Sequence, residues 1–320
     1  YGIPWRLPAS LKQAGDEVIR PFSFLTNSLE LEQAPCHIAY TNEKTHEIIR
    51  NSLDRSPLYS GVIEGVGPRY CPSIEDKVVR FPERNSHQTF LEPEGCHSDE
   101  VYPSGMSTSL PPDVQLDFYR SMVGLEQVEI MRPGYAIEYD FVEPTQLRPT
   151  LETRNVPGLY HAGQVNGTSG YEEAAAQGLL AGINAALQVT GREPITVGRD
   201  QAYLGVMVDD LVTQPTNEPY RMFTSRSEYR LLLREDNADQ RLTELGRSVG
   251  LVSDLRWGAY QKKLEEYHRG VELLSKQKIK PSNLTALESL GVSGLRNGVS
   301  FEELLRRPEI SIDALVLLGE

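Results

Sequence analysis

Cys71 is the side chain in this chain whose surroundings best suit nucleophilic or acid chemistry. It lies within Gly65–Phe81 (GVGPRYCPSIEDKVVRF), two residues after Arg69. A nearby cation lowers the pKa of a thiol and increases the fraction of thiolate. Pro68 and Pro72 stiffen the backbone on both sides of the sulfur. The pattern indicates a positioned nucleophile or acid, whereas an unpaired cysteine is also commonly a buried structural thiol, and both interpretations stay open.

A glycine-rich segment in the middle of the chain is suited to binding a cofactor through its backbone. Leu159–Ala162 predicts a short strand, and Tyr171–Leu187 predicts a helix rich in small residues. Between them, Gly163, Gly167 and Gly170 allow a tight turn and the close approach of a bulky ligand. A strand that feeds a helix N-terminus through glycines presents N–H groups to a cofactor. The alternative is a tight strand–helix junction with no ligand.

Three arginines at fourfold spacing form the third candidate. On a helix over Ser225–Arg234, the side chains of Arg226, Arg230 and Arg234 would share one face. Like charges at this spacing repel each other, so the stripe requires anions. RNA phosphates would serve, because the planar guanidinium binds two oxygens at once. Neighbouring acidic side chains would serve as well, and the sequence does not separate the two.

Several other chemistries lack their motifs. The six histidines show no metal-ligand spacing, and we expect no metal site. Cys36, Cys71 and Cys96 give neither a C-x-x-C redox pair nor a zinc pattern. No Walker A loop, H-E-x-x-H, G-x-S-x-G or helix-opening G-x-G-x-x-G is present.

The composition describes an acidic globular chain. Its 320 residues suffice for about two domains, and 39% are apolar, enough for a sizeable core. A net charge of -13 argues against indiscriminate binding to nucleic acids or acidic membranes. No apolar run is long enough to span a bilayer, no signal peptide is visible, and a reduced, cytoplasmic compartment is expected. The chain begins without Met and ends on an apolar stretch, so we expect a piece of something longer.

The elements that must position these residues change in kind along the chain. Short strands are expected at Gly61–Ile63, Val78–Phe81, Thr89–Leu91, Ser98–Tyr102 and Ala136–Phe141. Helices are expected in the same region at Thr45–Ser52 and Pro111–Met122. After Val197 the pattern becomes helical, with helices expected at Tyr203–Leu211, Ser225–Arg234, Asp239–Val249, Asp254–Lys276, Leu284–Leu290 and Phe301–Arg307. Ser300 with Glu303 resembles a capping box.

Long segments of the chain resemble one family. The most specific are GPRYCPSIEDKVVRF (67–81) and HAGQVNGTSGYEEAAAQGLLAGINAA (161–186). MFTSRSEYRLLLREDNADQRLTELG (222–246), PCHIAYTNEKTHEIIRNSL (35–53) and MRPGYAIEYDFVEPTQLRPTLET (131–153) fit as well. Together they are similar to the tRNA uridine 5-carboxymethylaminomethyl modification enzymes, the MnmG or GidA family, over nearly the whole chain.

The resemblance implies an α/β fold in three parts. Residues 1–143 would form an inserted, NAD-associated α/β domain, and residues 144–198 the last strand–helix unit of a glutathione-reductase-like FAD domain. Residues 199–320 would begin a mostly α-helical domain. The family's N-terminal FAD loop, its additional catalytic cysteine and the end of its helical domain are not in this sequence. We therefore expect an internal fragment that is inactive alone and retains little or no FAD.

The resemblance also implies site residues. Gln164 would contact FAD, together with Gly163, Asn166, Gly167, Gly170 and Tyr171. Cys71 would be catalytic, either as a nucleophile toward the uracil ring or as an acid. Arg226, Arg230 and Arg234 would contact tRNA phosphates. NAD would dock on Gly67, Pro68, Arg69, Tyr70, Cys71, Pro72, Ser73, Ile74, Glu75, Asp76, Lys77, Val78, Val79, Arg80 and Phe81.

The activity implied is FAD-dependent modification of the wobble uridine of tRNA. The family adds a carboxymethylaminomethyl group at C5, using NAD, a methylene-tetrahydrofolate carbon and the GTPase MnmE. It is cytoplasmic and homodimeric, forms a heterotetramer with MnmE and is not associated with a membrane. From the residues alone, two alternatives stay open. One is an NAD(P)H–FAD oxidoreductase of the glutathione-reductase type acting on a small molecule, and the other is a non-catalytic RNA- or protein-binding module.

Overall fold

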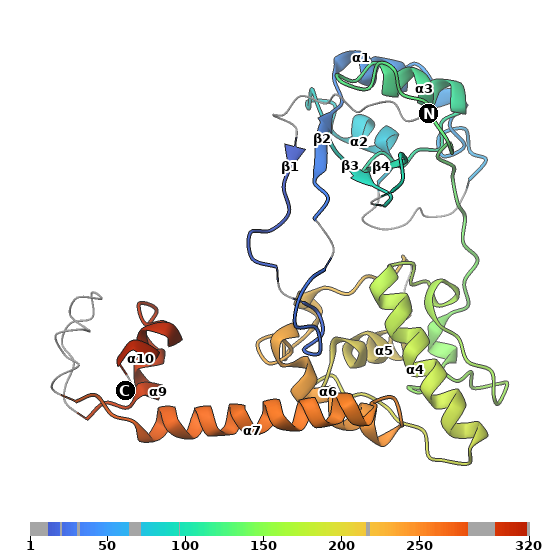
Figure 1. Ribbon diagram of the computed structural model, residues 1–320. Coiled ribbons are helices and arrows are strands. Elements are labelled where there is room, and N and C mark those ends of the chain that lie inside the picture. Colours follow the sequence, from blue (N-terminus) through green and yellow to red (C-terminus); the bar gives the residue numbers. More distant parts are fainter. Residues whose placement is uncertain are drawn as a thin grey trace. The chain divides into compact units, whose positions relative to one another are not determined.

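A computed structural model describes residues 12–19, 21–30, 33–63, 72–95, 97–215, 218–280 and 298–318 (Figure 1). Its helices are α1 (Glu43–Arg50), α2 (Ile74–Arg80), α3 (Pro112–Arg120), α4 (Tyr171–Val189), α5 (Tyr203–Thr213), α6 (Ala238–Ser248), α7 (Asp254–Lys276), α9 (Phe301–Leu305) and α10 (Ile312–Leu318). Its strands are β1 (Lys12–Gln13), β2 (Cys36–Tyr40), β3 (Gln88–Pro93) and β4 (Val101–Ser104). The 3-10 helices are η2 (Leu53–Arg55), η3 (Pro144–Gln146), η4 (Gly163–Asn166), η5 (Thr224–Arg226) and η6 (Glu235–Asn237). Cys96, Gly67–Cys71 and the expected helix Leu284–Leu290 lie outside the described residues.

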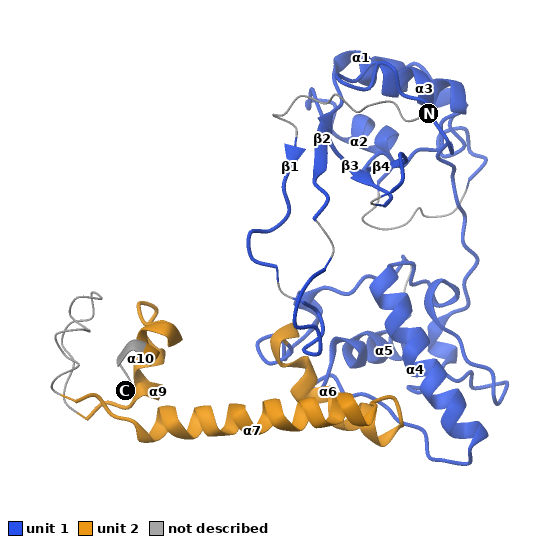
Figure 2. Ribbon diagram, viewed as in Figure 1, with its two compact units in different colours: residues 1–233 blue, residues 234–320 orange. Residues whose placement is uncertain are grey.

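The chain divides into two compact units, Tyr1–Leu233 and Arg234–Glu320 (Figure 2). The first combines helices with an antiparallel sheet, and the second is helical in its described part. This confirms the expected fold class, α/β followed by a mostly helical region. The division into 1–143, 144–198 and 199–320 stays a prediction.

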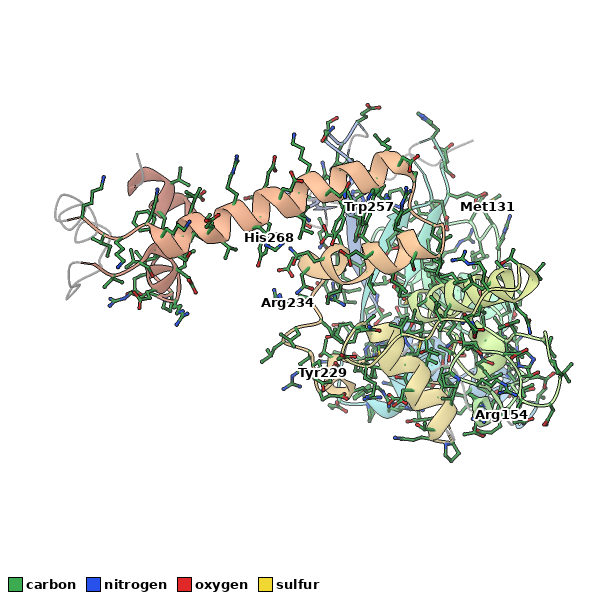
Figure 3. The ribbon with its side chains drawn as sticks, turned by 90° about the horizontal axis from the view of Figure 1, so that it is seen from below. Met131, Arg154, Tyr229, Arg234, Trp257 and His268 are labelled. Atoms are coloured by element: carbon green, nitrogen blue, oxygen red, sulfur yellow. The ribbon has the colours of Figure 1, made fainter. Side chains whose placement is uncertain are left out.

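The second unit is organised by helix caps and aromatic contacts. α7 begins and ends at the predicted residues, and Ser253 caps its first turn by accepting a hydrogen bond from the Arg256 N–H. Ser300 and Glu303 form the predicted capping box at α9. Trp257 of α7 is labelled in Figure 3, and the Cζ atom of Arg247 of α6 lies 5.9 Å from the centroid of its ring. A separate cluster of buried apolar side chains joins α9 and α10.

The sheet of the first unit is wholly antiparallel, in the order β1-β2-β3-β4. In β3, Thr89 and Leu91 are buried while Gln88 is exposed, the two-residue period of a strand with one face on a core. The predicted strand Thr89–Leu91 is thus confirmed. The strand expected at Ser98–Tyr102 is formed two to three residues later, as β4.

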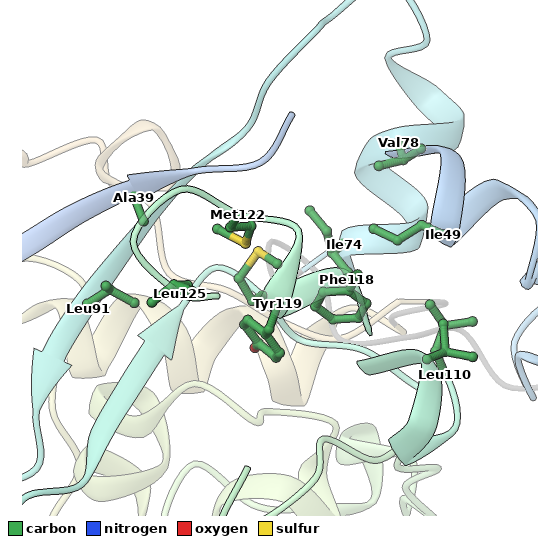
Figure 4. Close-up of a cluster of buried hydrophobic side chains, with 12 residues drawn as sticks. Ala39, Ile49, Ile74, Val78, Leu91, Leu110, Phe118, Tyr119, Met122 and Leu125 are labelled. Carbon is green, nitrogen blue, oxygen red and sulfur yellow. The ribbon is translucent and has the colours of Figure 1, made fainter. Parts of the chain in front are cut away.

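Helices α1, α2 and α3 share one apolar core with residues of strands β2 and β3 (Figure 4). Ile49 of α1, Ile74 and Val78 of α2, and Phe118 of α3 are completely buried. α1 and α3 lie side by side and match the predicted helices closely. Each such side chain contributes about 1.5–3 kcal/mol by leaving water. This core holds α2, the described end of the Cys71 segment, in place.

Two of the strands expected from the sequence are wrong. Val78–Arg80 belongs to α2 and Phe81 is its C-cap, while Ser73 caps its start by accepting a hydrogen bond from the Asp76 N–H at 3.1 Å. Ile74 and Val78 are both buried, so the apolar positions follow a four-residue helical spacing. Gly61–Ile63 forms a turn, with Gly61 at a positive φ of 77°.

Ala136–Phe141 is not a strand either, although its sequence alternates. Within the described residues no strand pairs with it, and a strand exists only when a partner takes up its N–H and C=O groups. The apolar residues of one parity, among them Tyr135, Ile137 and Tyr139, are exposed. Glu138 and Asp140, of the other parity, are exposed as well, so the alternating pattern predicts neither the burial nor the pairing of this segment.

A pair of buried histidines lies where β2, α1 and β3 meet. The rings of His46 and His87 are 5.2 Å apart, and both side chains are buried. Thr41 Oγ1 lies 2.7 Å from His46 Nε2 and accepts a hydrogen bond from the His87 N–H at 2.7 Å. Burial lowers the pKa of both imidazoles, and the cationic side chains around them lower it further.

The histidine pair predicts loss of stability in mild acid. Both groups titrate lower in the folded chain than in the unfolded chain, so the unfolded state binds more protons as the pH falls below about 6.5. The free energy of unfolding should be constant above that pH and fall toward the folded pKa. His46→Gln should flatten the dependence, measured as hydrogen exchange of the α1 amides at about pH 7.5 and about pH 5.5. His268→Gln, at an exposed position of α7, is the control; an unchanged slope in His46→Gln would contradict the assignment.

Candidate functional site: a glycine elbow and an arginine turn

The glycine-rich segment forms a compact elbow, defined here as residues 163–170, ahead of α4. Gly163 and Gly167 take left-handed backbone angles, with φ of 76° and 68°. The short 3-10 helix η4 runs between them, and the Gly167 N–H donates to the Gln164 carbonyl at 2.8 Å. Only glycine adopts these angles without steric cost.

The strand predicted before the elbow is wrong. Leu159–Ala162 forms no ladder, and Tyr160 makes a single isolated bridge with Glu152. The His161 N–H donates to the Leu151 carbonyl at 3.1 Å, so the segment pairs locally with the turn that precedes it. The short apolar run is only partly buried, with Leu159 exposed, so it indicates neither a ladder nor a core segment here.

The predicted helix is confirmed as α4, and its first turn has no side-chain cap because its N-cap is Gly170. Gly170 has an ordinary φ of -64°, which any residue can adopt, so glycine is needed here because its neighbours leave no room for a side chain. A Cβ there would lie 2.0 Å from Glu173 Oε2 and 2.9 Å from Arg221 Nε. The uncapped amides give the elbow a partial positive charge.

Glu173 ties the N-terminus of α4 to a segment some fifty residues later. Its Oε1 accepts hydrogen bonds from Arg221 Nε and the Met222 N–H, both at 3.0 Å. Burial raises the pKa of this carboxyl, but the bonds from Met222 and Arg221 outweigh it, and the pKa lies below its usual value. Glu173 is therefore a buried, paired carboxylate at neutral pH.

Two further segments flank the elbow. Gln164 Nε2 donates to the Asp140 carbonyl at 2.5 Å, and the Val142 N–H donates to the Val165 carbonyl at 2.8 Å. On the other flank, the Tyr220 N–H donates to the Gly167 carbonyl at 2.8 Å. The elbow is thus held between residues 140–142 and 220–222.

The residues expected to contact FAD lie together in this elbow and, for Tyr171, at the first residue of α4. Gly163, Asn166 and Gly170 are buried, Gln164 and Gly167 are half-buried, and Tyr171 is 90% exposed. Among the buried polar atoms of the described residues, seven lack a hydrogen-bond partner, and four of these belong to residues in or beside the elbow. They are Glu143 Oε1, His161 Nδ1, Asn166 Oδ1 and Glu173 Oε2. Buried polar groups normally have partners, so this concentration fits a site for a polar ligand.

The described part of the expected NAD segment, Pro72–Phe81, is anchored by its acidic residues. Glu75 is completely buried, and its Oε1 accepts from both the N–H and the hydroxyl of Ser109 at 2.8 Å. Asp76 accepts from the Tyr59 hydroxyl at 2.9 Å. Burial, followed by this bond, raises the pKa of Tyr59 to about 12. These contacts fix α2, while Gly67–Cys71 lie outside the described residues.

The helix expected at Ser225–Arg234 is wrong. Residues 224–226 form η5, Ser227 is extended, and residues 228–232 form a turn, called here the arginine turn. Arg199 accounts for this shape, because it donates to Glu228 at 2.8 and 2.9 Å and to the Arg226 carbonyl at 3.1 Å. The Arg226 carbonyl thus accepts from Arg199, whereas in a helix it would accept from the N–H four residues later.

The three arginines consequently do not form one stripe. Arg226 lies over the Tyr220 ring, 4.6 Å from its centroid, and its Nε donates to the Arg221 carbonyl. Arg230 is exposed on the arginine turn beside Tyr229, which Figure 3 labels. Arg234 begins the other unit, and its Nε lies 3.4 Å from Asp236 Oδ2.

Arg199 is the important residue that sequence reasoning missed. It also donates to Asp209 and Asp210 of α5, at 3.0 and 2.8 Å, so one guanidinium joins α5 to the base of the arginine turn. The hydrogen bond from Arg199 lowers the pKa of Glu228 to about 2. A lone arginine ten residues before an Asp-Asp pair carries no periodic signal.

Two classes of site are not found among the described residues. No three His, Cys, Asp or Glu side chains there are grouped in a way that could hold a metal ion. None of the helices in that part of the chain combines the length and apolar character needed to cross a membrane.

Comparison with known proteins identifies the family. The profile described as "Glucose inhibited division protein A" matches residues 7–193, more than half of the chain. The chain belongs to this family. A second profile, described as the "tRNA modifying enzyme MnmG/GidA C-terminal helical domain", matches residues 254–320.

Curated relatives and solved structures agree with this family. The chain is 62% identical to the tRNA uridine 5-carboxymethylaminomethyl modification enzyme MnmG of Syntrophotalea carbinolica, over 100% of this chain and 53% of that protein. It is 63% identical to the protein of the same name from Geobacter sulfurreducens, over 95% and 49%. Aquifex aeolicus GidA in its form I crystal shares 49% identity with a TM-score of 0.76, covering 89% of this chain and 51% of that one. The chain spans about half the length of the curated relatives it matches.

The space at Gly170 predicts a local steric defect. Gly170→Ala should displace Glu173 and Arg221 and lower the free energy of unfolding by about 1–3 kcal/mol, the cost of losing hydrogen bonds to a buried carboxylate. Urea unfolding would measure this. Gly178→Ala in the same helix is the control, since its Cβ would meet nothing within 4 Å; it should stabilise the chain by up to about 1 kcal/mol. Equal effects of the two substitutions would contradict the assignment.

Proposed function

We propose that this chain carries the flavin-contacting elbow and part of the RNA-binding surface of an enzyme that modifies the wobble uridine of tRNA at C5. Membership of the glucose inhibited division protein A family supports the proposal, as does the similarity to MnmG proteins. The observation that carries it is the elbow itself. Two left-handed glycines, the uncapped N-terminus of α4 and a group of unpaired buried polar atoms meet there.

FAD would be held by the elbow, with Gln164 and the glycines at 163, 167 and 170 against it. When bound, the flavin supplies two-electron redox chemistry. The uncapped amides of α4 favour negative charge beside them, and Glu173 offsets part of that field while paired with Arg221. NAD, docked along Gly67–Phe81, would be the source of reducing equivalents, and methylene-tetrahydrofolate the source of the carbon.

Cys71 would act on the uracil ring. Addition of its thiolate to the ring carbon next to C5 forms a C–S bond and moves the ring's electron pair toward C5, which becomes nucleophilic. Once C5 has formed its new bond and released its proton, expulsion of the thiolate restores the ring. The alternative role that we retain for Cys71 is proton donation.

Among the three arginines, the exposed Arg230 is the strongest candidate for a phosphate contact. Its turn is fixed at its base by Arg199 and Glu228, so the tip is presented without a large ordering cost. Arg226 supports the turn through Tyr220 rather than facing solvent freely, and Arg234 shares its charge with Asp236. Tyr229 offers an aromatic face beside Arg230, 42% exposed, on which a base can stack.

The proposal extends to the assembly. A homodimer in the cytoplasm, joined to the GTPase MnmE in a heterotetramer, would bring tRNA to this surface. Residues 1–143 would then serve as the NAD-associated domain, 144–198 as the end of the FAD domain and 199–320 as the start of the helical domain.

The role of Cys71 is tested in a full-length protein carrying this sequence. Cys71→Ser should abolish wobble-uridine modification while flavin absorbance survives, because serine keeps the shape but is not ionised at neutral pH. Modified tRNA nucleosides, quantified after digestion, are the readout. Cys36→Ser on β2 is the matched control and should retain modification. Normal modification by the Cys71 variant would remove the thiol from the mechanism.

The arginine turn is tested by tRNA binding at several salt concentrations. Arg230→Ala should weaken binding and reduce the slope of log K against log salt by about 1, the loss of one phosphate contact. Arg226→Ala should mainly lower stability, since it removes the contact with Tyr220. Arg120→Ala, which removes an exposed arginine of α3, should leave the tRNA affinity and its salt slope unchanged. An unaltered slope in Arg230→Ala would show that the turn does not contact phosphate.

A further inference from the structure

The elbow is supported from its buried side by a residue that is not among the expected cofactor contacts. Gln177 lies at the seventh residue of α4 and is completely buried. Its Oε1 accepts hydrogen bonds from the Gly163 N–H at 2.8 Å and from Asn166 Nδ2 at 2.9 Å. One side-chain oxygen thus holds both ends of the short helix η4.

The orientation of the Gln177 amide is fixed by its partners. The Gly163 N–H can only donate, so the atom facing it must be the oxygen. The Gln177 amide nitrogen then faces α5, where it lies 3.6 Å from Met207 Sδ. Met207 belongs to a buried cluster with Leu211 and Tyr220, so the amide links the elbow to a rigid interior.

The same contact fixes the amide of Asn166. Because Nδ2 of Asn166 donates to Gln177, its Oδ1 is the atom without a partner in the described structure. Gln164, two residues earlier, is held at its far end by the Asp140 carbonyl. The backbone of Gln164 is therefore set by Gln177, and its side-chain direction by residue 140.

We propose that Gln177 is the positioning residue of the elbow, which places Gln164 and the glycine backbone for the cofactor without touching it. The inference rests on the proposed function, since it assigns Gln177 a role in flavin binding. α4 is independently packed through Leu180, Ala181 and other apolar residues. Loss of the Gln177 amide therefore perturbs the elbow while leaving the helix in place.

The experiment uses three variants of the full-length protein. Gln177→Met keeps the length of the side chain and removes the acceptor. Gln177→Glu keeps the acceptor, because both donors face the oxygen. Gln188→Met is the matched control, an exposed glutamine of the same helix that bonds Glu152 and Tyr160 outside the elbow.

In Gln177→Met the Gly163 amide should exchange faster with solvent, and the dissociation constant for FAD should rise about tenfold or more, as expected for an unsatisfied buried N–H. Gln177→Glu should restore the Gly163 protection and most of the FAD affinity. Gln188→Met should match the wild-type protein in both measurements.

The outcomes separate the two proposals. If the wild-type protein binds FAD, and Gln177→Met has the affinity and visible spectrum of Gln188→Met, the positioning role is overturned while the proposed function stands. If Gln177→Met loses affinity for FAD while the Gly163 amide keeps its wild-type protection, the hydrogen bond to Gly163 does not set the affinity and the inference is also overturned. A wild-type protein that binds no FAD overturns the proposed function, and the inference with it.

Discussion

The buried carboxylate of Glu173 is the constraint on which the elbow depends. A charge removed from water must be paired, and Glu173 is paired by the guanidinium of Arg221 and the backbone of Met222. This requirement brings residues 220–222 against the start of α4. It also leaves no room for a side chain at residue 170. The local sequence of the elbow and a segment fifty residues away are therefore parts of one structure.

The same segment joins the elbow to the arginine turn. Tyr220 donates through its backbone to Gly167 and through its hydroxyl to Asp210 at 2.8 Å. Arg226 lies against the Tyr220 ring, and Arg199 connects Asp210 with Glu228. A continuous set of hydrogen bonds and ring contacts thus runs from the glycines to the base of the exposed turn. The candidate RNA contact and the candidate cofactor contact share one framework.

The sequence predicted what depends on local periodicity and capping. α1, α3, α4, α6 and α7 follow their apolar spacing, and the Ser300 capping box is formed as expected. The glycines of the elbow are equally predictable, because glycine alone adopts left-handed backbone angles without steric cost.

The failures have a common physical origin. Val78–Phe81 and Ser225–Arg234 are short windows whose conformation is decided by residues outside them, by the Ser73 cap and by Arg199. Gln177 and Arg199 carry no signal in the sequence, because the partners of a polar side chain are set only when distant segments meet. The prediction that three arginines share one face is wrong because the helix on which it depends is not formed.

The alternating segment Ala136–Phe141 has a consequence for handling the chain. Its aromatic and aliphatic side chains of one parity face water, and its backbone is not used in a ladder of the described structure. Such a segment is a template for edge-to-edge association between molecules. Glu138 and Asp140 interrupt the apolar run and act as gatekeepers. The colloidal behaviour of a concentrated sample consequently depends on these two side chains, and replacing them with apolar residues favours cross-β assembly over a clear solution.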